Sequence, residues 1–497
     1  MGTWWVLALT MAKAAAAAAA AVEQQPNVLF IAVDDMRPLF GFEDETIQTP
    51  HLDGLAQDAL VLRSHVQYAL CAPSRASVMF GRRPDTLRVW ELEDNPRAWC
   101  EDCLTIPLHF KDAGYFTKGV GKLFHPVKEL QNDPRSWSTP YFEGPDPYLN
   151  SPSSWLEVDE SQTGECRDTV VRGHVTDWLS AEAALNEPFF LGVGFRKPHL
   201  SFAVPKQFYE PYDDVELAPN PFAPVGMPPV AYASYEVENF DDIKALGYTG
   251  EINQTLPDWK ARELVRAYRA GVTYADHNIG VVLAATRDHV FWDHTIVCVW
   301  SDHGWKLGHH GGWAKHTVFA EDTTAPIFLR VPGVTDGRGR LSPALVEHVD
   351  IMPTLVEAAL HNNLPLCLEE EDHDACTEGV SFYQVAATPD RDTHKTAVFA
   401  QYMRWGGPTG KIMGYEMTTN DLRFTAWVPF DYAAAQPIWD LGLCNVWYPV
   451  RCAFELYDHA VDPLENRNIA DGAMDLISSV LMPQLRAGWR AAVPAIP

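Results

Sequence analysis

Short apolar runs without polar interruption recur along the chain, and polar residues follow each of them. Residues 28–33 form one run and lead into two aspartates, and residues 296–300 form another, followed two positions later by an Asp-His pair. Runs of the same kind occupy the stretches PFFLGVGFRKPH and APIFLRVPG. A continuous apolar run is typical of a strand buried on both faces, as in a parallel sheet.

A long segment of helical periodicity separates these runs. Between Leu264 and Leu283, apolar residues recur every three or four positions, which predicts an amphipathic helix packed on a sheet. Strands that alternate with helices predict the α/β class, with a wound sheet. Ligands of such sheets bind outside the carboxyl ends of the strands, which is where the polar residues after each run fall.

The pattern changes from about residue 393. The stretches HKTAVFAQYM, KIMGYEMTTN and LRFTAWVPF look like short antiparallel strands with turns between them. A last helix is predicted over about residues 473–492. We therefore expect a larger domain over residues 26–392 and a smaller C-terminal subdomain over residues 393–497.

The first 25 residues have the pattern of a secretory signal peptide, with an apolar run from Trp4 and small residues near position 20. Lys13 lies inside the run rather than before it, which leaves a wrongly assigned start or an unusual anchor as the alternative. No later run is long enough to cross a bilayer. We expect a mature chain without a membrane span, and the sequon at Asn253 fits the secretory route.

Composition narrows the class of protein further. The chain is 47% hydrophobic and 11% aromatic, which is ample for a buried core and excludes disorder. Its formal net charge is −28, which argues against nucleic acid as a partner. An anionic substrate would therefore need a locally basic pocket.

Nine cysteines in a secreted chain indicate disulfides with at least one cysteine left over. Two pairs flank short loops and are the disulfide candidates: Cys367 with Cys376, and Cys444 with Cys452. Cys100 and Cys103 form a C-x-x-C, which we interpret as a tight disulfide or two free thiols. Cys298 lies in an apolar run and is expected to be a core residue.

The polar residues after the first and the later run form a candidate metal site: Asp34, Asp35, Asp302 and His303. Three carboxylates in a small space repel one another unless a cation neutralises them, which suggests Ca²⁺ or Mg²⁺. The alternative is that Asp34 and Asp35 only cap the next element.

The stretch CAPSRASVMFGRRPDT places Cys71 in a surface loop before a helix that we expect to begin near Pro73. Backbone N–H groups at a helix start favour anions, and the guanidinium of Arg75 suits an oxyanion. Further cations and imidazoles lie near strand ends: Lys122, His125, Lys197, His199 and Lys315. Each alone is better explained as a surface charge or a satisfied histidine, but together they predict a pocket for a tetrahedral oxyanion.

The same stretch resembles the signature of the type I sulfatases, Cys-x-Pro-Ser-Arg followed by Gly-Arg at a fixed offset. Other segments similar to this family follow in order along nearly the whole chain: VLFIAVDDMRP, TPHLDGLA, GYFTKGVGKLFHP, LGVGFRKPHLSF, SDHGWKLGHHGGWAKH and ELYDHAVDPLENRNIA. GRRPDT, GKLFHP and KIMGY are most similar to the iduronate-2-sulfatase branch. The resemblance implies an alkaline-phosphatase-like wound mixed sheet flanked by helices, with an antiparallel sheet in the smaller C-terminal α+β subdomain.

The resemblance also implies a chemistry. In this family the formylglycine-generating enzyme oxidises the signature cysteine during secretion, so Cys71, as hydrated formylglycine, is the expected nucleophile. A calcium ion is implied, with the formylglycine and four further residues as ligands: Asp34, Asp35, Asp302 and His303. The remaining implied roles are these: Arg75 and Lys122 hold the formylglycine, His125 is the base for elimination, Lys315 and His199 contact sulfate, and His199 is the acid for the leaving alkoxide.

The branch implies removal of the 2-O-sulfate from terminal L-iduronate of dermatan or heparan sulfate, in a lysosomal or extracellular enzyme. His309 and Gly312 stand where acidic residues are expected in vertebrate members. Residues 127–165 and 210–255 match poorly and are expected to form the rim that recognises the sugar. A sulfatase for another sulfated polysaccharide or a small sulfate ester is therefore the first alternative.

Two other classes are less well supported. A phosphatase or phosphonate hydrolase of the wider alkaline phosphatase superfamily shares metal-bearing strand ends, but Cys71 before Pro-Ser-Arg argues against it. A secreted glycan-binding protein with an unmodified Cys71 would not need the full set of candidate catalytic residues.

Overall fold

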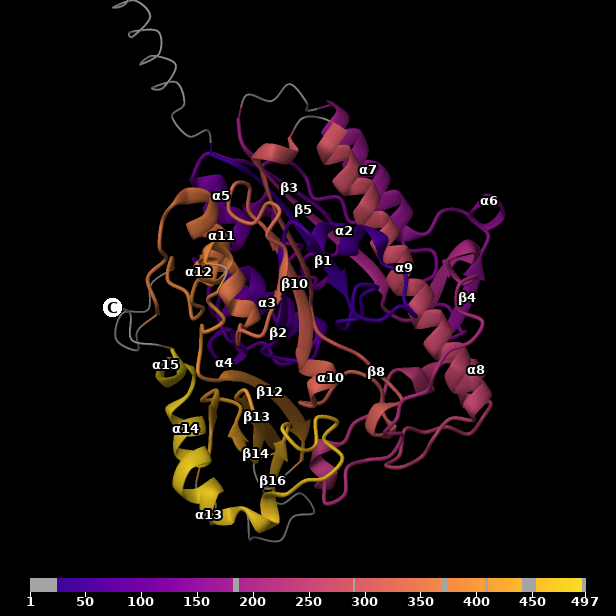
Figure 1. The fold of residues 1–497 in the computed structure, drawn as a ribbon, viewed down its shortest axis with the longest axis vertical. Helices are drawn as coiled ribbons and strands as arrows, with labels where there is room; N and C mark the ends of the chain where they lie inside the picture. Colours follow the sequence, from indigo (N-terminus) through magenta and orange to yellow (C-terminus); the bar gives the residue numbers. More distant parts are fainter. Residues whose placement is uncertain are drawn as a thin grey trace, which may run out of the picture.

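The computed structural model describes residues 25–181, 187–288, 291–367, 374–388, 390–406, 410–439 and 453–493. Within these ranges the chain forms two larger sheets and two small two-stranded sheets (Figure 1). The predicted signal segment up to residue 24, and the candidate disulfide between Cys444 and Cys452, lie outside the described residues.

The larger sheet has seven strands in the order β11-β2-β10-β7-β1-β5-β3. Their bounds are β1 Asn27–Asp34, β2 Leu60–His65, β3 Phe116–Gly121, β5 Phe189–Pro198, β7 Thr295–Ser301, β10 Thr324–Arg330 and β11 Arg340–Ser342. β1 pairs in parallel with β5 and β7, whereas β10 is antiparallel to β2 and β7. The sheet is therefore mixed, and the four apolar runs are strands as predicted.

Helices cover both faces of this sheet (Figure 1). One face carries α2 Pro50–Ala56, α7 Arg167–Ala181 and α9 Asp258–Asp288, and the other carries α3 Cys71–Phe80, α5 Ile106–Asp112, α11 Ile351–Leu360 and α12 Tyr383–Ala387. Alternate residues of β1 serve the two faces, with Val33 on the α9 side and Phe30 on the α3 side. The strand is buried along its whole length for this reason.

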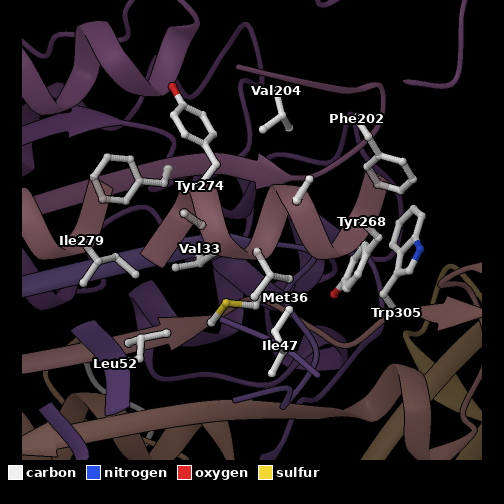
Figure 2. Close-up of a cluster of buried hydrophobic side chains, with 14 of the residues drawn as sticks. Val33, Met36, Ile47, Leu52, Phe202, Val204, Tyr268, Tyr274, Ile279 and Trp305 are labelled. Carbon is white, nitrogen blue, oxygen red and sulfur yellow. The ribbon is translucent and has the colours of Figure 1, made fainter. Parts of the chain in front are cut away.

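The core beneath α9 contains large side chains from distant parts of the chain. Figure 2 shows Tyr268 and Ile279 of this helix on either side of Val33 and Met36, whereas the ring of Tyr274 is directed away from them, toward α7. Complete burial of one such aliphatic side chain contributes about 1.5–3 kcal/mol. The predicted amphipathic helix is confirmed. Its apolar side chains pack on the strands that lead to the polar cluster.

The second larger sheet is antiparallel and lies in the C-terminal part of the chain. Its strands are β12 Val398–Trp405, β13 Lys411–Thr418, β14 Leu422–Asp431, β15 Gln436–Pro437 and β16 Ala453–Asp458. The prediction of short antiparallel strands after residue 393 is confirmed.

The single C-terminal helix predicted over residues 473–492 is wrong. The segment contains α13 Met474–Leu476, a π-helical turn over Ile477–Leu481, α14 Met482–Ala487 and α15 Trp489–Ala492. Gly488, at φ 69° and ψ −169°, separates the last two helices. A glycine adopts this conformation without steric cost, so the chain changes direction there.

Shorter elements complete the described fold. The small sheets pair β4 Trp155–Val158 with β6 Phe202–Pro205, and β8 Lys306–Leu307 with β9 Trp313–Ala314. The remaining short helices are α4 Pro84–Leu87, α6 Glu160–Thr163, α8 Asp241–Lys244 and α10 Ala320–Thr323. No helix in the described part of the chain is both long and apolar enough to cross a membrane.

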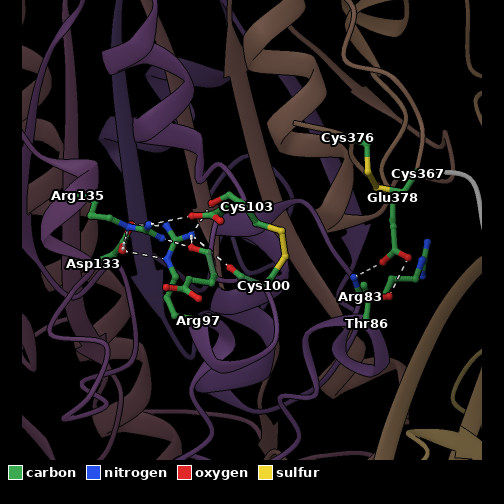
Figure 3. The surroundings of a disulfide bond; sticks show 12 residues. Arg83, Thr86, Arg97, Cys100, Cys103, Asp133, Arg135, Cys367, Cys376 and Glu378 are labelled. Atoms are coloured by element: carbon green, nitrogen blue, oxygen red, sulfur yellow. Dashed lines mark hydrogen bonds and ion pairs between the residues drawn. A yellow bond between two sulfur atoms is a disulfide. The ribbon is translucent and has the colours of Figure 1, made fainter. Parts of the chain in front are cut away.

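Two disulfides are present, Cys100–Cys103 and Cys367–Cys376 (Figure 3). Arg97 lies against the first of them and donates hydrogen bonds to the carbonyl oxygens of both its cysteines. Its guanidinium also binds Asp133. The described free cysteines, Cys71, Cys166 and Cys298, are all buried.

Candidate active site

The candidate site lies at the carboxyl ends of β1, β5 and β7. Asp34 is the last residue of β1, and Asp302 directly follows β7. Because β1 is parallel to both neighbours, the three strand ends meet at one edge of the sheet. The structure therefore places the polar residues of all three runs together, where ligands of wound sheets bind.

The acidic residues at this edge are completely buried. Ligand atoms of Asp35, Cys71, Asp302 and His303 all lie within 4.8 Å of one another. Burial raises the pKa of Asp35 well above its ordinary value, and the neighbouring Asp34 and Asp302 add to this, although Lys315 opposes it. A buried, mutually repelling set of carboxylates with one imidazole fits a hard divalent cation such as Ca²⁺.

Asp34 differs from Asp35 because two cations hold it. Burial alone would raise its pKa, but Lys122 and Arg75 outweigh this effect and keep the pKa well below its ordinary value. Lys122 Nζ lies 2.5 Å from Asp34 Oδ2, and Arg75 Nη2 lies 3.0 Å from Oδ1. Asp34 therefore stays ionised whether or not a metal is bound.

Cys71 is the first residue of α3 and is only 2% exposed, so the expectation of a surface loop is wrong. The first turn of α3 packs into the sheet edge, where Cys71 Sγ lies 3.6 Å from Asp34 Oδ1 and 3.7 Å from Lys315 Nζ. Burial and then Asp34 raise the pKa of its thiol well above the ordinary value. An unmodified Cys71 would remain protonated and would be a poor nucleophile.

Arg75 binds the acidic cluster instead of facing open space. Its Nε donates to Asp302 Oδ2 at 2.8 Å, and its Nη1 donates to the carbonyl oxygens of Lys122 and Leu123. Such fork-like contacts fix both position and direction. Arg75 therefore orients the carboxylates around residue 71.

His125 lies beside the site with an open nitrogen. Burial, with Lys122 adding to it, lowers the pKa of His125 to about 3. Its Nδ1 is buried and has no hydrogen-bond partner among the described residues. The imidazole is therefore neutral, and its unused nitrogen becomes an effective proton acceptor when the negative charge of a bound sulfate raises its pKa toward the working pH.

His199 is held by the turn that follows β5. Its Nδ1 bonds to the carbonyl oxygen of Leu200, and its Nε2 lies 4.0 Å from Asp35 Oδ2. Burial and Lys315 lower its pKa well below the ordinary value. The imidazole therefore needs a nearby negative charge, such as that of a bound sulfate ester, before it holds a second proton.

Lys197 does not join the oxyanion pocket that the sequence suggested. Its Nζ donates to the carbonyl oxygens of His199 and Ser201. Burial lowers its pKa to about 8. Lys197 instead stabilises the turn that carries His199.

Lys315 connects the acidic cluster with the rim. Its Nζ lies 2.9 Å from Asp35 Oδ1 and 3.3 Å from Glu236 Oε1, and its side chain is buried. Sequence reasoning missed Glu236, because no motif or spacing marks it within the poorly matching stretch. It also missed Asp168, whose carboxylate accepts the backbone N–H groups of Arg196 and Lys197 at 2.8 Å each.

A cavity of about 770 Å³ is lined by the segment that directly follows His125 in the sequence. Its wall begins at Pro126 and includes both polar and aromatic side chains: Lys128, Gln131, Asn132, Trp137 and Tyr141. The cavity falls within the stretch 127–165 that was expected to form part of the rim.

Comparison with solved structures defines the class of fold. The structure of BT4656 in complex with its substrate D-glucosamine-2-N,6-O-disulfate aligns with a TM-score of 0.69 at 19% identity, covering 93% of this chain and 97% of that one. A phosphonate monoester hydrolase from Silicibacter pomeroyi aligns with the same TM-score and identity, covering 94% and 96%. The chain has the alkaline-phosphatase-like fold that sulfatases and phosphonate hydrolases share.

Sequence comparison then gives the family. The Sulfatase family model matches residues 26–361. Human iduronate 2-sulfatase is 32% identical to this chain in an alignment 527 residues long, gaps included. The alignment covers 92% of this chain and 93% of the human enzyme. The chain belongs to the sulfatase family and is an enzyme that hydrolyses sulfate esters, near the iduronate-2-sulfatase branch.

Proposed function

We propose that this sulfatase removes the 2-O-sulfate from terminal L-iduronate of dermatan or heparan sulfate. The observation that carries this proposal is the similarity, over nearly the full length of both chains, to an enzyme named iduronate 2-sulfatase. The molecule carries a net negative charge, but the ammonium groups of Lys122 and Lys315 lie at the strand ends. They supply the local positive charge that an anionic sugar needs.

We propose Cys71 as the residue that the formylglycine-generating enzyme converts, and Asp34, Asp35, Asp302 and His303 as ligands of one calcium ion together with residue 71. The donor set fits, because three buried carboxylates and one imidazole converge there. Residue 71, held in this cluster, would as hydrated formylglycine supply two hydroxyls: one could attack sulfur as the ester bond to the sugar breaks, and the other, on losing its proton, could form the aldehyde as sulfate leaves. Calcium supplies a Lewis acid that polarises a sulfate oxygen.

The chain's own side chains position the reactants and move protons. Arg75 and Lys122 fix the carboxylate of Asp34 beside residue 71. Lys315 is proposed to bind a sulfate oxygen, and its Nζ, 3.7 Å from the Sγ of Cys71, supports this role. His125, neutral in the site, accepts a proton from the second hydroxyl at position 71.

His199 is proposed to protonate the departing sugar oxygen. Its Nδ1 is occupied by the carbonyl oxygen of Leu200, so the opposite nitrogen is the one directed to the site. The negative charge of the bound ester raises the pKa of this imidazole and allows it to hold the proton that it donates. A sugar hydroxyl is a poor leaving group, so this proton matters for the rate.

The cellular setting is also a proposal. We propose maturation in the secretory pathway and a lysosomal or extracellular destination, with glycosylation at the exposed Asn253. We likewise propose residues 26–392 as the catalytic domain and residues 393–497 as the C-terminal subdomain. The match of the family model to residues 26–361 and the start of the second sheet at Val398 support this division.

A competition among substrates tests the proposed specificity. Purified enzyme is assayed on a disaccharide with terminal 2-O-sulfated iduronate, on glucosamine 6-sulfate and on 4-nitrophenyl sulfate. We expect kcat/KM on the iduronate substrate to exceed the others by about 100-fold. A higher kcat/KM on another sulfated sugar would replace this proposal with the alternative of a different sulfated glycan.

A further inference from the structure

The carboxylate of Glu236 lies at the border between the rim and the reacting groups. Its Oε1 is 3.3 Å from Lys315 Nζ, and the same ammonium is 3.7 Å from Cys71 Sγ. The side chain of Glu236 is 25% exposed, whereas that of Lys315 is 1% exposed. One cation therefore joins the candidate nucleophile position to a partly open acidic group.

A network from three separate segments fixes this carboxylate. His316 Nε2 bonds to Glu236 Oε1 at 2.7 Å, and His316 Nδ1 bonds to the Tyr402 hydroxyl at 2.6 Å. Tyr235 stacks on the His316 ring with centroids 3.8 Å apart, and its hydroxyl lies 3.0 Å from that of Tyr402. Rim, active-site loop and C-terminal sheet thus hold one another in place.

The backbone is strained where these contacts are made. Glu236 has φ 121° and His316 has φ 83°, both in a region that favours glycine. Such conformations cost side-chain-bearing residues free energy and persist only where the surroundings over-determine them. The contacts of Glu236 are thus enforced by the fold and not left to a freely moving loop.

One oxygen of Glu236 is left open. Lys315 and His316 both engage Oε1, and among the described residues no hydrogen-bond donor reaches Oε2. Burial alone would raise the pKa of Glu236, but Lys315 and His316 outweigh it and keep the carboxylate ionised. An ionised carboxylate accepts hydrogen bonds and donates none, so it attracts hydroxyl groups and repels anions.

We propose that Glu236 is a specificity-determining residue that accepts a hydrogen bond from a free hydroxyl on the sugar carbon next to the sulfated one. Glu236 can reach this hydroxyl because Lys315 contacts both Glu236 and the position of the reacting sulfate. The carbons that bear the sulfate and the neighbouring hydroxyl are joined directly, so the two oxygens lie close together. The ionised carboxylate also disfavours a second sulfate at that neighbouring carbon. The inference rests on the proposed function only in requiring a sulfated sugar at residue 71.

The test combines two variants of one residue with substrates that differ in one hydroxyl. Wild type, Glu236→Gln and Glu236→Ala are assayed on a 2-O-sulfated iduronide, on its 3-deoxy analogue and on 4-nitrophenyl sulfate. Glu187→Gln is the matched control, because Glu187 is exposed and precedes the amino end of β5, opposite to the site. Melting temperatures establish that each variant is folded.

We expect wild type to lose at least about tenfold in kcat/KM when the 3-hydroxyl is removed, since a site built to bind a hydroxyl rejects the analogue that lacks it. Glu236→Ala should show a similar loss on the parent sugar, little further loss on the deoxy analogue, and a clearly smaller loss on 4-nitrophenyl sulfate, which lacks the hydroxyl and feels only the altered contact with Lys315. Glu236→Gln, which retains an acceptor oxygen, should fall between wild type and Glu236→Ala.

Two results would overturn the proposal. If Glu236→Ala loses the same factor in kcat/KM on all three substrates, relative to wild type, Glu236 acts by positioning Lys315 and does not bind the sugar hydroxyl. Equal activity of wild type on the parent and the deoxy analogue would show that no such hydroxyl is read. If wild type ignores iduronides but cleaves another sulfated sugar, the proposed function fails, and the same comparison on that sugar's deoxy analogue tests Glu236.

Discussion

Lys315 and Asp35 form a fully buried ion pair, with Nζ 2.9 Å from Oδ1. The pair occupies the place where the candidate cation ligands converge. A cation bound by Asp35 would take over part of the neutralisation that Lys315 now provides. Lys315 would then be available to a sulfate oxygen, so metal binding and substrate binding are expected to support each other.

The first prediction concerns the metal. The proposed calcium ion would bind only the folded chain, so protein stripped with a chelator should melt at a lower temperature and recover on addition of Ca²⁺. The gain is about 2.7 kcal/mol when free Ca²⁺ is 100 times its dissociation constant. Scanning calorimetry checks this, and Asp302→Asn should lose most of the response. A wild-type melting temperature that ignores both chelator and Ca²⁺ would contradict the assigned site.

The second prediction concerns residue 71. In protein secreted from a eukaryotic host, the peptide covering residues 64–75 should be about 18 Da lighter than its cysteine form, as formylglycine requires. Cys71→Ala should lower kcat by about 10⁴-fold or more, with a stability cost of only about 1 kcal/mol because few atoms are removed.

Mass spectrometry and a melting curve settle both points. An unmodified thiol, from a host that converts a control sulfatase, would leave the chain without its nucleophile and favour a glycan-binding protein. Substantial turnover by Cys71→Ala would exclude the formylglycine mechanism altogether.

The third prediction concerns His125. Its pKa of about 3 means that it is neutral above that pH and does not change protonation as the pH rises further. His125→Gln should lower kcat by about 10²–10⁴-fold with a smaller change in KM, since it removes a proton acceptor. An inflection in the kcat profile between about pH 5 and 7 that disappears in this variant would show that His125 titrates there instead.

The fourth prediction concerns acid stability. Buried Glu347 binds Arg83 and Lys395, each at 2.6 Å. Burial raises its pKa, but these two cations outweigh it and bring the pKa to about 2, below the value of 4.5 of the unfolded chain. The unfolded state therefore binds the proton first, so this stabilisation is present above about pH 4.5 and is lost as the pH falls toward 2.

Glu347→Gln should lower the free energy of unfolding at pH 7 by about 3–5 kcal/mol, because it leaves buried Arg83 without the carboxylate that it binds and leaves Lys395 with Asp350 alone. The matched control is Glu43→Gln, which breaks an exposed pair with Arg63 and should cost less than about 1 kcal/mol. Urea titrations at pH 7 and pH 3 measure both. Equal costs for the two variants at pH 7 would refute the argument from burial.

The sequence predicted the strands and the acidic site well, because the apolar runs that mark the strands also locate the polar residues at their ends. Uninterrupted apolar runs mark strands that are buried on two faces, and parallel pairing brings Asp34 and Asp302 to one edge. For these residues, a position directly after an apolar run was therefore enough to predict their place in the site.

Residues whose position depends on tertiary contacts were beyond such reasoning. Glu236 reaches Lys315 only through the fold of an irregular loop, and Asp168 is a helix residue that binds backbone N–H groups near the end of β5. The burial of Cys71 was missed because the packing of α3 against the strand ends, not the local sequence, excludes water there. The broken C-terminal helix shows that apolar periodicity does not report a glycine hinge.

The rim and the reacting groups have different supports in this molecule. Asp34, Asp302 and Cys71 are anchored at the ends of buried elements, whereas Glu236 and the cavity lined by the segment after His125 belong to irregular parts of the chain. Evolution, or a protein engineer, can therefore exchange the loop that lines the cavity without rebuilding the strand ends, whereas a change at Glu236 also alters a contact of Lys315. A different loop at this cavity is expected to change which sugars bind, while the residues at the strand ends keep their positions.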